Sequence, residues 1–267
     1  SRGCPYQCVF CLWPRTMYGR KFRARSPGNV VDEVEHVVDD YGVDEIYFDD
    51  DCLTLDKKRL IRICGEIRKR GIDVNWMCQS RVDNVDQELL REMKRVGCHY
   101  IKYGVESGSQ EMLNAMKKGI TLEEVRRAFK LSKKVGIKTQ AFFLFGLPWD
   151  THQTIRQTIE FAKELKPDSA QFAIVVPHPG TELYDICLKE GWLRFESWED
   201  FDCRKALIET ENLLARDVEK YRIDAYREFY FRPSYILKTV LKMWNYKEAK
   251  RILRSARSVI ERLSYYK

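Results

Sequence analysis

The stretch that decides the fold is SRGCPYQCVFCLWP, residues 1–14. It places Cys4, Cys8 and Cys11 at the spacing C-x3-C-x2-C, with no further cysteine or histidine close by in the sequence. A closed zinc site needs four ligands, usually as two short-spaced pairs, and the chain offers no second pair. Three thiolates in one loop instead favour an iron-sulfur cluster whose fourth iron keeps an open coordination position.

The composition places this loop in an ordinary globular chain. Its 267 residues are 44% apolar and 33% charged, enough for one large domain with an appendage. There is no long apolar run or secretory signal, and an odd number of cysteines argues against a disulfide framework, so we expect a cytoplasmic protein. The net charge of +7 is concentrated after Phe229, so the basic character belongs to the tail.

Short apolar runs alternate with amphipathic stretches along the chain. Strands are predicted at 44–51, 73–81, 98–108, 138–148 and 168–180. Helices are predicted at 30–40, 56–70, 86–96, 121–135 and 151–165. This alternation predicts parallel strands joined by right-handed crossovers, in either a doubly wound sheet or a partial barrel. In a barrel, the loops after the strands carry the chemistry.

With Phe10 just before its third cysteine, the opening loop resembles the signature of the radical S-adenosylmethionine (radical SAM) superfamily. Later stretches resemble the same family in the expected order: FDDDCLT, ESGSQEML, FFLFGLPWDT and PHPGTELY. The resemblance covers residues 1–200. It implies an α/β fold, a partial (β/α)6 radical SAM barrel over 1–203 with its first strand truncated, followed by a helical, basic extension over 204–267.

The resemblance also implies the chemistry. Cys4, Cys8 and Cys11 would hold three irons of a 4Fe-4S cluster, and S-adenosylmethionine would bind the fourth. In this family the reduced cluster splits S-adenosylmethionine into methionine and a 5′-deoxyadenosyl radical, which abstracts hydrogen from an unactivated carbon. A reductant such as ferredoxin or flavodoxin would supply the electron.

Two groups of residues are expected to contact the methionine end and the adenine of S-adenosylmethionine. Phe10 would lie beside the adenine. Asp49, Asp50 and Asp51 occupy the place where many members carry a Gly-Gly-Glu turn that receives the methionine amino group. Here Asp49 and Asp50, or a backbone carbonyl at the strand end, would receive it. The alternative is a solvated strand end and helix N-cap. Arg81 would form a bidentate pair with the methionine carboxylate, or else a surface ion pair.

The nucleoside is expected to lie near the third to fifth predicted strands. Glu106 ends an otherwise apolar strand, where a buried carboxylate needs donors such as the ribose hydroxyls. Ser107 follows it, and Gln140 and Gly146 would complete the pocket, Gly146 by allowing close approach of the backbone. His178 is interpreted either as a satisfied loop histidine or as a substrate or proton-transfer residue.

Within the superfamily, the opening loop followed by YGRKFRARSPGNVVDEVE resembles two groups. One is the tRNA methylthiotransferases. The other is the cobalamin-binding radical SAM enzymes of the hopanoid-biosynthesis and anaerobic magnesium-protoporphyrin ester cyclase type, which the triple aspartate and CLWP favour. The second group implies an upstream cobalamin-binding domain, and a small-molecule, hydrophobic or lipid-like substrate for methylation, cyclisation or C–C bond formation. The C-terminus reads as helices, which disfavours a nucleic-acid partner, but the tRNA-modifying alternative stays open.

The tail carries a helical apolar stripe: Ile252, Leu253, Ala256, Val259, Ile260 and Leu263. Lysines and arginines surround it. A basic amphipathic helix of this kind either lies on an anionic membrane or docks on the barrel with its charges in solvent. Peripheral membrane contact of a cytoplasmic enzyme is therefore one of two interpretations.

Overall fold

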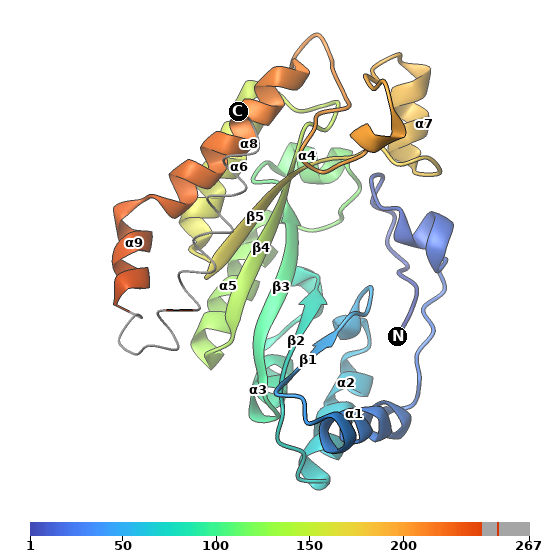
Figure 1. The fold of residues 1–267 in the computed structure, drawn as a ribbon, viewed down its shortest axis with the longest axis vertical. Helices are drawn as coiled ribbons and strands as arrows, with labels where there is room; N and C mark the ends of the chain where they lie inside the picture. The colour runs from blue at the N-terminus through green and yellow to red at the C-terminus, as the bar shows by residue number, and fades with distance from the viewer. Residues whose placement is uncertain (242–249, 251–267) are drawn as a thin grey trace.

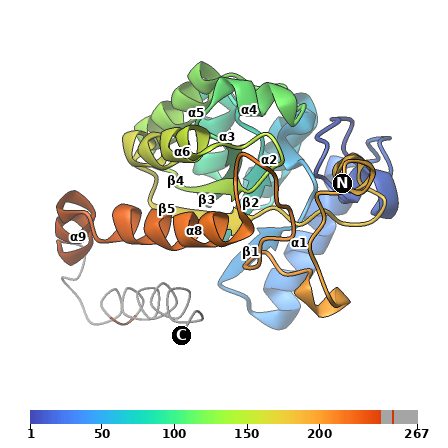
Figure 2. The same ribbon diagram turned by 90° about the horizontal axis from the view of Figure 1, so that it is seen from above.

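The centre of the molecule is a parallel sheet. The computed structural model describes residues 1–241 and residue 250. Its strands are β1 (Glu45–Phe48), β2 (Asn75–Ser80), β3 (Cys98–Glu106), β4 (Lys138–Phe145) and β5 (Ser169–Ile174). They lie in the order β1-β2-β3-β4-β5, and every neighbouring pair is parallel. A doubly wound sheet reverses its order at a switch point, whereas this curved sheet does not (Figures 1 and 2). The predicted barrel-like α/β fold is confirmed.

Helices connect successive strands and cover the outer face of the sheet (Figure 2). The five that the periodicity predicts are α1 (Pro27–Tyr41), α2 (Lys57–Lys69), α3 (Gln87–Arg95), α5 (Leu122–Val135) and α6 (His152–Leu165). Each begins after a Ser, Thr or Asp side chain that accepts a backbone N–H of the first turn. Two short helices, α4 (Gln110–Ala115) and α7 (Glu182–Lys189), are not in the prediction and lie near the carboxyl ends of the strands (Figure 1).

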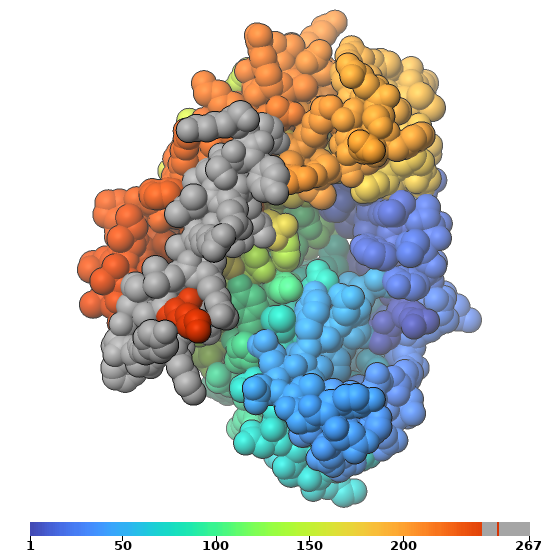
Figure 3. Space-filling model, viewed as in Figure 1, coloured from blue at the N-terminus to red at the C-terminus, as the bar shows by residue number. Residues whose placement is uncertain are grey.

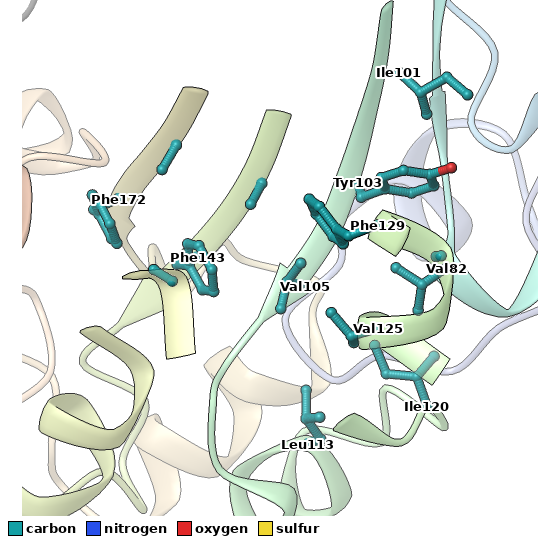
Figure 4. Close-up of a cluster of buried hydrophobic side chains, with 14 of the residues drawn as sticks. Val82, Ile101, Tyr103, Val105, Leu113, Ile120, Val125, Phe129, Phe143 and Phe172 are labelled. Atoms are coloured by element: carbon teal, nitrogen blue, oxygen red, sulfur yellow. The ribbon is translucent and has the colours of Figure 1, made fainter. Parts of the chain in front are cut away.

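Strand residues that face the helices form the apolar core. Tyr103 and Val105 of β3 and Phe143 of β4 are at most 1% exposed, and they lie near Val125 and Phe129 of α5 (Figure 4). Along β4 buried and partly exposed residues alternate, so the other face of the sheet is the more open one. Burying a large apolar side chain contributes about 1.5–3 kcal/mol, so this layer holds the strands in place.

The two edge strands of the sheet, β5 and β1, differ in what covers their free edges. At β5, the hydroxyl of Tyr230 accepts from the Ala170 N–H at 3.0 Å and donates to its carbonyl at 2.7 Å, and the hydroxyl of Tyr226 accepts from the Phe172 N–H. These tyrosines belong to α8 (Ala215–Tyr230), which therefore closes that edge. Among the residues that the structure describes, β1 pairs with β2 alone, and beside its other edge lies a cavity of about 660 Å³ lined by α1 and by Arg59.

The C-terminal part of the described chain packs on the sheet. Val218, Tyr226 and Phe229 of α8 belong to the same apolar core as the strands. α9 (Pro233–Val240) follows and leaves Leu237 exposed. The predicted apolar stripe of 252–263 lies outside the described residues, and the predicted boundary after residue 203 stays a prediction. Among the described helices, none has the length and apolarity to cross a membrane.

Candidate active site

Residues 1–12, here called the cysteine loop, are held by other parts of the chain. The loop lies on the surface between the segment around α7 and α1 (blue in Figure 3). Val9 is buried; its N–H donates to the Met116 carbonyl at 3.1 Å, and its carbonyl accepts from Leu183 at 3.0 Å. The Gly3 N–H donates to the Asp51 carboxylate at 2.7 Å. Segments far apart in sequence therefore fix the loop.

The three cysteines of the loop are half-buried free thiols. Burial raises the pKa of Cys4 and raises that of Cys11 to about 12, so both stay protonated until a metal displaces the proton. In the described part of the chain, no three acidic, cysteine or histidine side chains are placed to share one metal ion. A cubane cluster binds each cysteine to a different iron. Three free cysteines in one loop are the donor set that such a cluster requires.

The triple aspartate that follows β1 meets the start of the cysteine loop. Asp50 is buried, and its carboxylate accepts from the Ser1 hydroxyl. Asp51, the third aspartate of the run, accepts the Gly3 N–H. Asp49 is exposed and lines the cavity beside β1. Of the two predicted aspartates, the structure brings Asp50 to the loop.

Arg81 lies at the end of β2 and is 7% exposed. Its Nε and Nη2 donate to the two carboxylate oxygens of Asp83 at 3.0 and 2.9 Å, and Nη2 also donates to the Lys118 carbonyl at 2.8 Å. The guanidinium carbon lies 3.5 Å from the centre of the Tyr6 ring. A methionine carboxylate would have to compete with Asp83 for this fork.

Glu106 ends β3 in a strained conformation. Its φ is +70°, and the pairing with β4 shifts register between Gly104 and Glu106. Its Oε1 accepts from the Nζ of Lys118 at 2.6 Å, and both side chains are buried. Burial lowers the pKa of Lys118, but Glu106 outweighs it, so the net shift is upward. The desolvation of both charges offsets most of the attraction in a buried ion pair, so this pair need not stabilise the fold. We therefore include it in the candidate site.

Ser107 and Gln140 lie at different depths along the sheet, Ser107 directly after the carboxyl end of β3. The Ser107 hydroxyl lies 3.0 Å from that of Thr158 on α6, which ties the loop after β3 to that helix. Gln140 precedes Phe145, the last residue of β4, by five positions, which puts it roughly 16 Å down the strand. Phe10 is half-buried and packs against the apolar core. Gln140 therefore lies deep along β4, whereas Ser107 stays at the carboxyl end of β3 and is bonded to α6.

The turn after β4, residues 146–150, is held by hydrogen bonds to the carboxylate of its last residue, Asp150. Asp150 accepts the N–H groups of Gly146 and Leu147 at 3.0 and 3.1 Å and the hydroxyl of Thr154 at 2.8 Å. Burial raises the pKa of Asp150 to about 6, although these hydrogen bonds lower it. Gly146 has φ +81°, and a Cβ there would lie 2.9 Å from Val218. The sequence showed this motif, but the role of Asp150 was missed.

Aromatic side chains gather beyond β5. The ring of His178 lies 6.2 Å from that of Phe201, which contacts Phe195 and Trp198 at 5.0 and 4.9 Å between ring centres. Trp198 is 64% exposed. Burial lowers the pKa of His178, so the imidazole is neutral at physiological pH. This end of the sheet thus offers apolar surface.

Comparison with known proteins identifies the family. Residues 1–162 match the family model of the radical SAM superfamily. The chain belongs to the radical SAM superfamily. It is 35% identical over 242 residues to an uncharacterized methyltransferase of Pyrococcus horikoshii, which covers 91% of the chain and 52% of that relative. It is 34% identical over 186 residues to the anaerobic magnesium-protoporphyrin IX monomethyl ester cyclase of Rubrivivax gelatinosus, covering 69% of the chain and 33% of the cyclase.

A solved structure supports the same fold for this radical SAM chain. The cobalamin-dependent S-adenosylmethionine radical enzyme OxsB, with aqua-cobalamin and S-adenosylmethionine bound, matches with a TM-score of 0.71 and 19% identity. The match covers 96% of the chain and 44% of OxsB. The radical SAM chain thus spans about half the length of these relatives or less. The predicted resemblance to the radical SAM superfamily, and within it to the anaerobic magnesium-protoporphyrin ester cyclases, is confirmed.

Proposed function

We propose that this chain is the catalytic barrel of a cobalamin-dependent radical SAM enzyme of the methyltransferase or cyclase type. The observation that carries the proposal is the cysteine loop. It holds three half-buried thiols and is hydrogen-bonded through Val9 to the loop after α4, which also supplies Lys118, the partner of Glu106. The buried ion pair between Lys118 and Glu106 and the strained backbone of Glu106 are features that concentrate at functional sites.

The residues divide the work of holding the cofactors. Cys4, Cys8 and Cys11 would bind the irons of a 4Fe-4S cluster, which when bound supplies the electron that cleaves S-adenosylmethionine to the 5′-deoxyadenosyl radical. Glu106 would accept the ribose hydroxyls, since a carboxylate bonded to one lysine keeps further lone pairs. Asp50 would receive the methionine amino group.

The remaining predicted contacts belong to the adenosine end. Phe10 would lie beside the adenine. The turn from Gly146 to Asp150 would present its backbone to the nucleoside, held by the Asp150 carboxylate. Ser107 would act indirectly, by tying the residues after Glu106 to α6. Gln140 is left out because of its depth along β4.

The substrate is proposed to be a hydrophobic small molecule. The aromatic side chains beyond β5 support this, since Trp198 is exposed and its ring contacts Phe201 at a tilted angle outside the apolar core. The OxsB match and the methyltransferase and cyclase relatives support cobalamin as a second cofactor. A corrinoid that co-purifies with the full-length protein would support this part of the proposal; salt-sensitive tRNA binding with no corrinoid would contradict it.

The open edge of β1 supports the expected further strand. The Arg59 Nη1 is buried without a hydrogen-bond partner in the described part of the chain, and Arg59 lines the cavity along that edge. A parallel strand placed there would pair with β1, and its carbonyls would satisfy such a donor. Hydrogen exchange on the full-length protein tests this: slow exchange along Glu45–Phe48 is expected, and fast exchange would contradict it.

The test of the catalytic claim is anaerobic. The full-length protein is reconstituted with iron and sulfide, reduced with dithionite and given S-adenosylmethionine, and 5′-deoxyadenosine is measured. We expect product from the wild type and none from Cys8→Ala, because one iron loses its ligand. Product from Cys8→Ala, or none from a wild type that carries the cluster, would contradict the proposal.

A further inference from the structure

The strongest unassigned feature of the site is the surroundings of Arg81. Its Nε and one terminal nitrogen are fixed by Asp83 and by the Lys118 carbonyl, all within 3.0 Å. Because Asp83 lies only two residues further along the chain, this pair is formed locally and orients the plane of the guanidinium. The side chain is also almost fully buried. The guanidinium of Arg81 is therefore held in one orientation at the end of β2.

The Tyr6 ring covers one face of the Arg81 guanidinium. The guanidinium carbon lies 3.5 Å from the ring centre, a close cation–π contact. The Tyr6 hydroxyl donates to the Asn84 side-chain oxygen at 2.9 Å, and the Asn84 nitrogen donates to the Cys52 sulfur at 3.3 Å. Tyr6 lies midway between Cys4 and Cys8. The ring and the hydroxyl of Tyr6 thus attach the first half of the cysteine loop to Arg81 and Asn84.

The second half of the loop is held differently. Val9 makes two backbone hydrogen bonds, to Met116 and from Leu183. Met116 lies in the same segment as Lys118, whose carbonyl Arg81 also holds. One segment therefore supports both halves, through the backbone on one side and through Arg81 on the other. In the described residues, the first half depends on side chains that are more than 45 positions away.

We infer that Arg81 is a positioning residue for the cysteine loop, which holds Cys4 and Cys8 in place through Tyr6. This inference rests on the proposed function, because it assigns Arg81 to the cluster and not to the carboxylate of S-adenosylmethionine. A positive charge near the thiolates also stabilises the more negative, reduced cluster. Arg81 therefore sets both how firmly the cluster is held and how readily it is reduced.

The two roles of Arg81 predict different results in the absence of S-adenosylmethionine. A residue that only binds the methionine carboxylate would leave cluster assembly unchanged and weaken binding of S-adenosylmethionine. A positioning residue would change the cluster before any S-adenosylmethionine is added. Retention of iron and the reduction potential of the cluster therefore separate the two roles.

The experiment uses the reconstituted full-length protein and its variants without S-adenosylmethionine. Arg81→Lys keeps the positive charge but loses the paired hydrogen bonds to Asp83 and the planar group that contacts the Tyr6 ring. Arg81→Met loses the charge as well, and Tyr6→Ala removes the other half of the contact. Arg126→Lys is the matched control, because Arg126 makes the same fork to Glu164 and lies 5.0 Å from the Phe161 ring, on the outer helices.

We expect a chelator to remove iron roughly tenfold faster or more from Arg81→Lys, Arg81→Met and Tyr6→Ala, the usual size of such supporting contacts. Only Arg81→Met should also show a clearly lower reduction potential. Arg126→Lys should match the wild type. Thermal unfolding of each apo-protein identifies a variant that fails to fold, and Tyr6→Ala, on a different segment, then decides the outcome.

Three results separate the possibilities. Wild-type iron retention in both Arg81→Lys and Tyr6→Ala would overturn the inference. Normal retention with weakened binding of S-adenosylmethionine in Arg81→Lys would assign Arg81 to the carboxylate instead. A wild type that assembles no 4Fe-4S cluster would overturn the proposed function itself, and the inference with it.

Discussion

The cysteine loop and the turn from Gly146 to Asp150 are both proposed to hold parts of one cofactor, but different contacts hold each of them. The turn is held by its own carboxylate and by Thr154, all within nine residues. The cysteine loop is held by Asp51, Arg81 and Asn84 and by the backbone of Met116 and Leu183. The turn therefore forms locally, whereas the loop needs the folded barrel.

The comparison has a physical consequence. A loop held by distant groups is in place only after those segments have assembled, so the cluster should be the last part of the site to form. The turn keeps its shape at the cost of a buried carboxylate whose pKa is raised. A change to the barrel should therefore disturb the cluster, while a change of pH should alter the charge of Asp150 in the turn.

The largest effect is expected for Gly3→Ala. Gly3 has φ +88°, and a Cβ would lie 2.2 Å from the Lys21 carbonyl oxygen, so the backbone must move and the Arg2–Arg23 pairing with it. We expect loss of most of the iron after reconstitution. Gly19→Ala is the control, since Gly19 has φ +75° but open space around it. Equal iron content in the two variants would contradict this account of the loop.

A smaller effect is expected for Gly146→Ala. The positive φ and the 2.9 Å approach to Val218 should together lower the free energy of unfolding by about 2 kcal/mol, measured by denaturant titration. Gly136→Ala has a similar φ of +76° and its nearest neighbour at 3.9 Å, so it should lose only about 1 kcal/mol. If Gly136→Ala costs as much, the contact with Val218 does not matter.

The smallest effect concerns the pH dependence of Asp150. Its pKa is about 6 in the folded chain against an ordinary 3.8, so the folded state binds the proton more tightly. The stability contributed by this group therefore rises as the pH falls through 6. The free energy of unfolding of the wild type relative to Asp150→Asn should increase by about 1 kcal/mol from pH 7 to pH 5. A flat difference would place the carboxylate in a wetter environment.

The sequence predicts what is local and periodic. The five strands and the five helices that connect or follow them, α1, α2, α3, α5 and α6, follow from hydrophobic patterns, and the structure confirms them. α4 and α7 were missed because six to eight residues are too few for a clear helical period. The pairing of Lys118 with Glu106 was missed as well, since a lysine in a polar loop gives no sign that it is buried.

The cysteine loop shows the same limit more clearly. Its three ligands are obvious from spacing, yet its supports are not, because Tyr6 and Arg81 are 75 positions apart and only the folded chain brings them together. The sequence could also point to a carboxylate partner for Arg81, but not to Asp83 as that partner. The ligands of a site are thus readable from the sequence, whereas the contacts that position them depend on tertiary structure.

The most direct test of the central claim is the electron paramagnetic resonance spectrum of the reconstituted, dithionite-reduced protein with and without S-adenosylmethionine. The account predicts the signal of a reduced 4Fe-4S cluster that shifts when S-adenosylmethionine is added, because three cysteines leave one iron open to bind it. A 4Fe-4S signal that S-adenosylmethionine leaves unchanged would contradict the account.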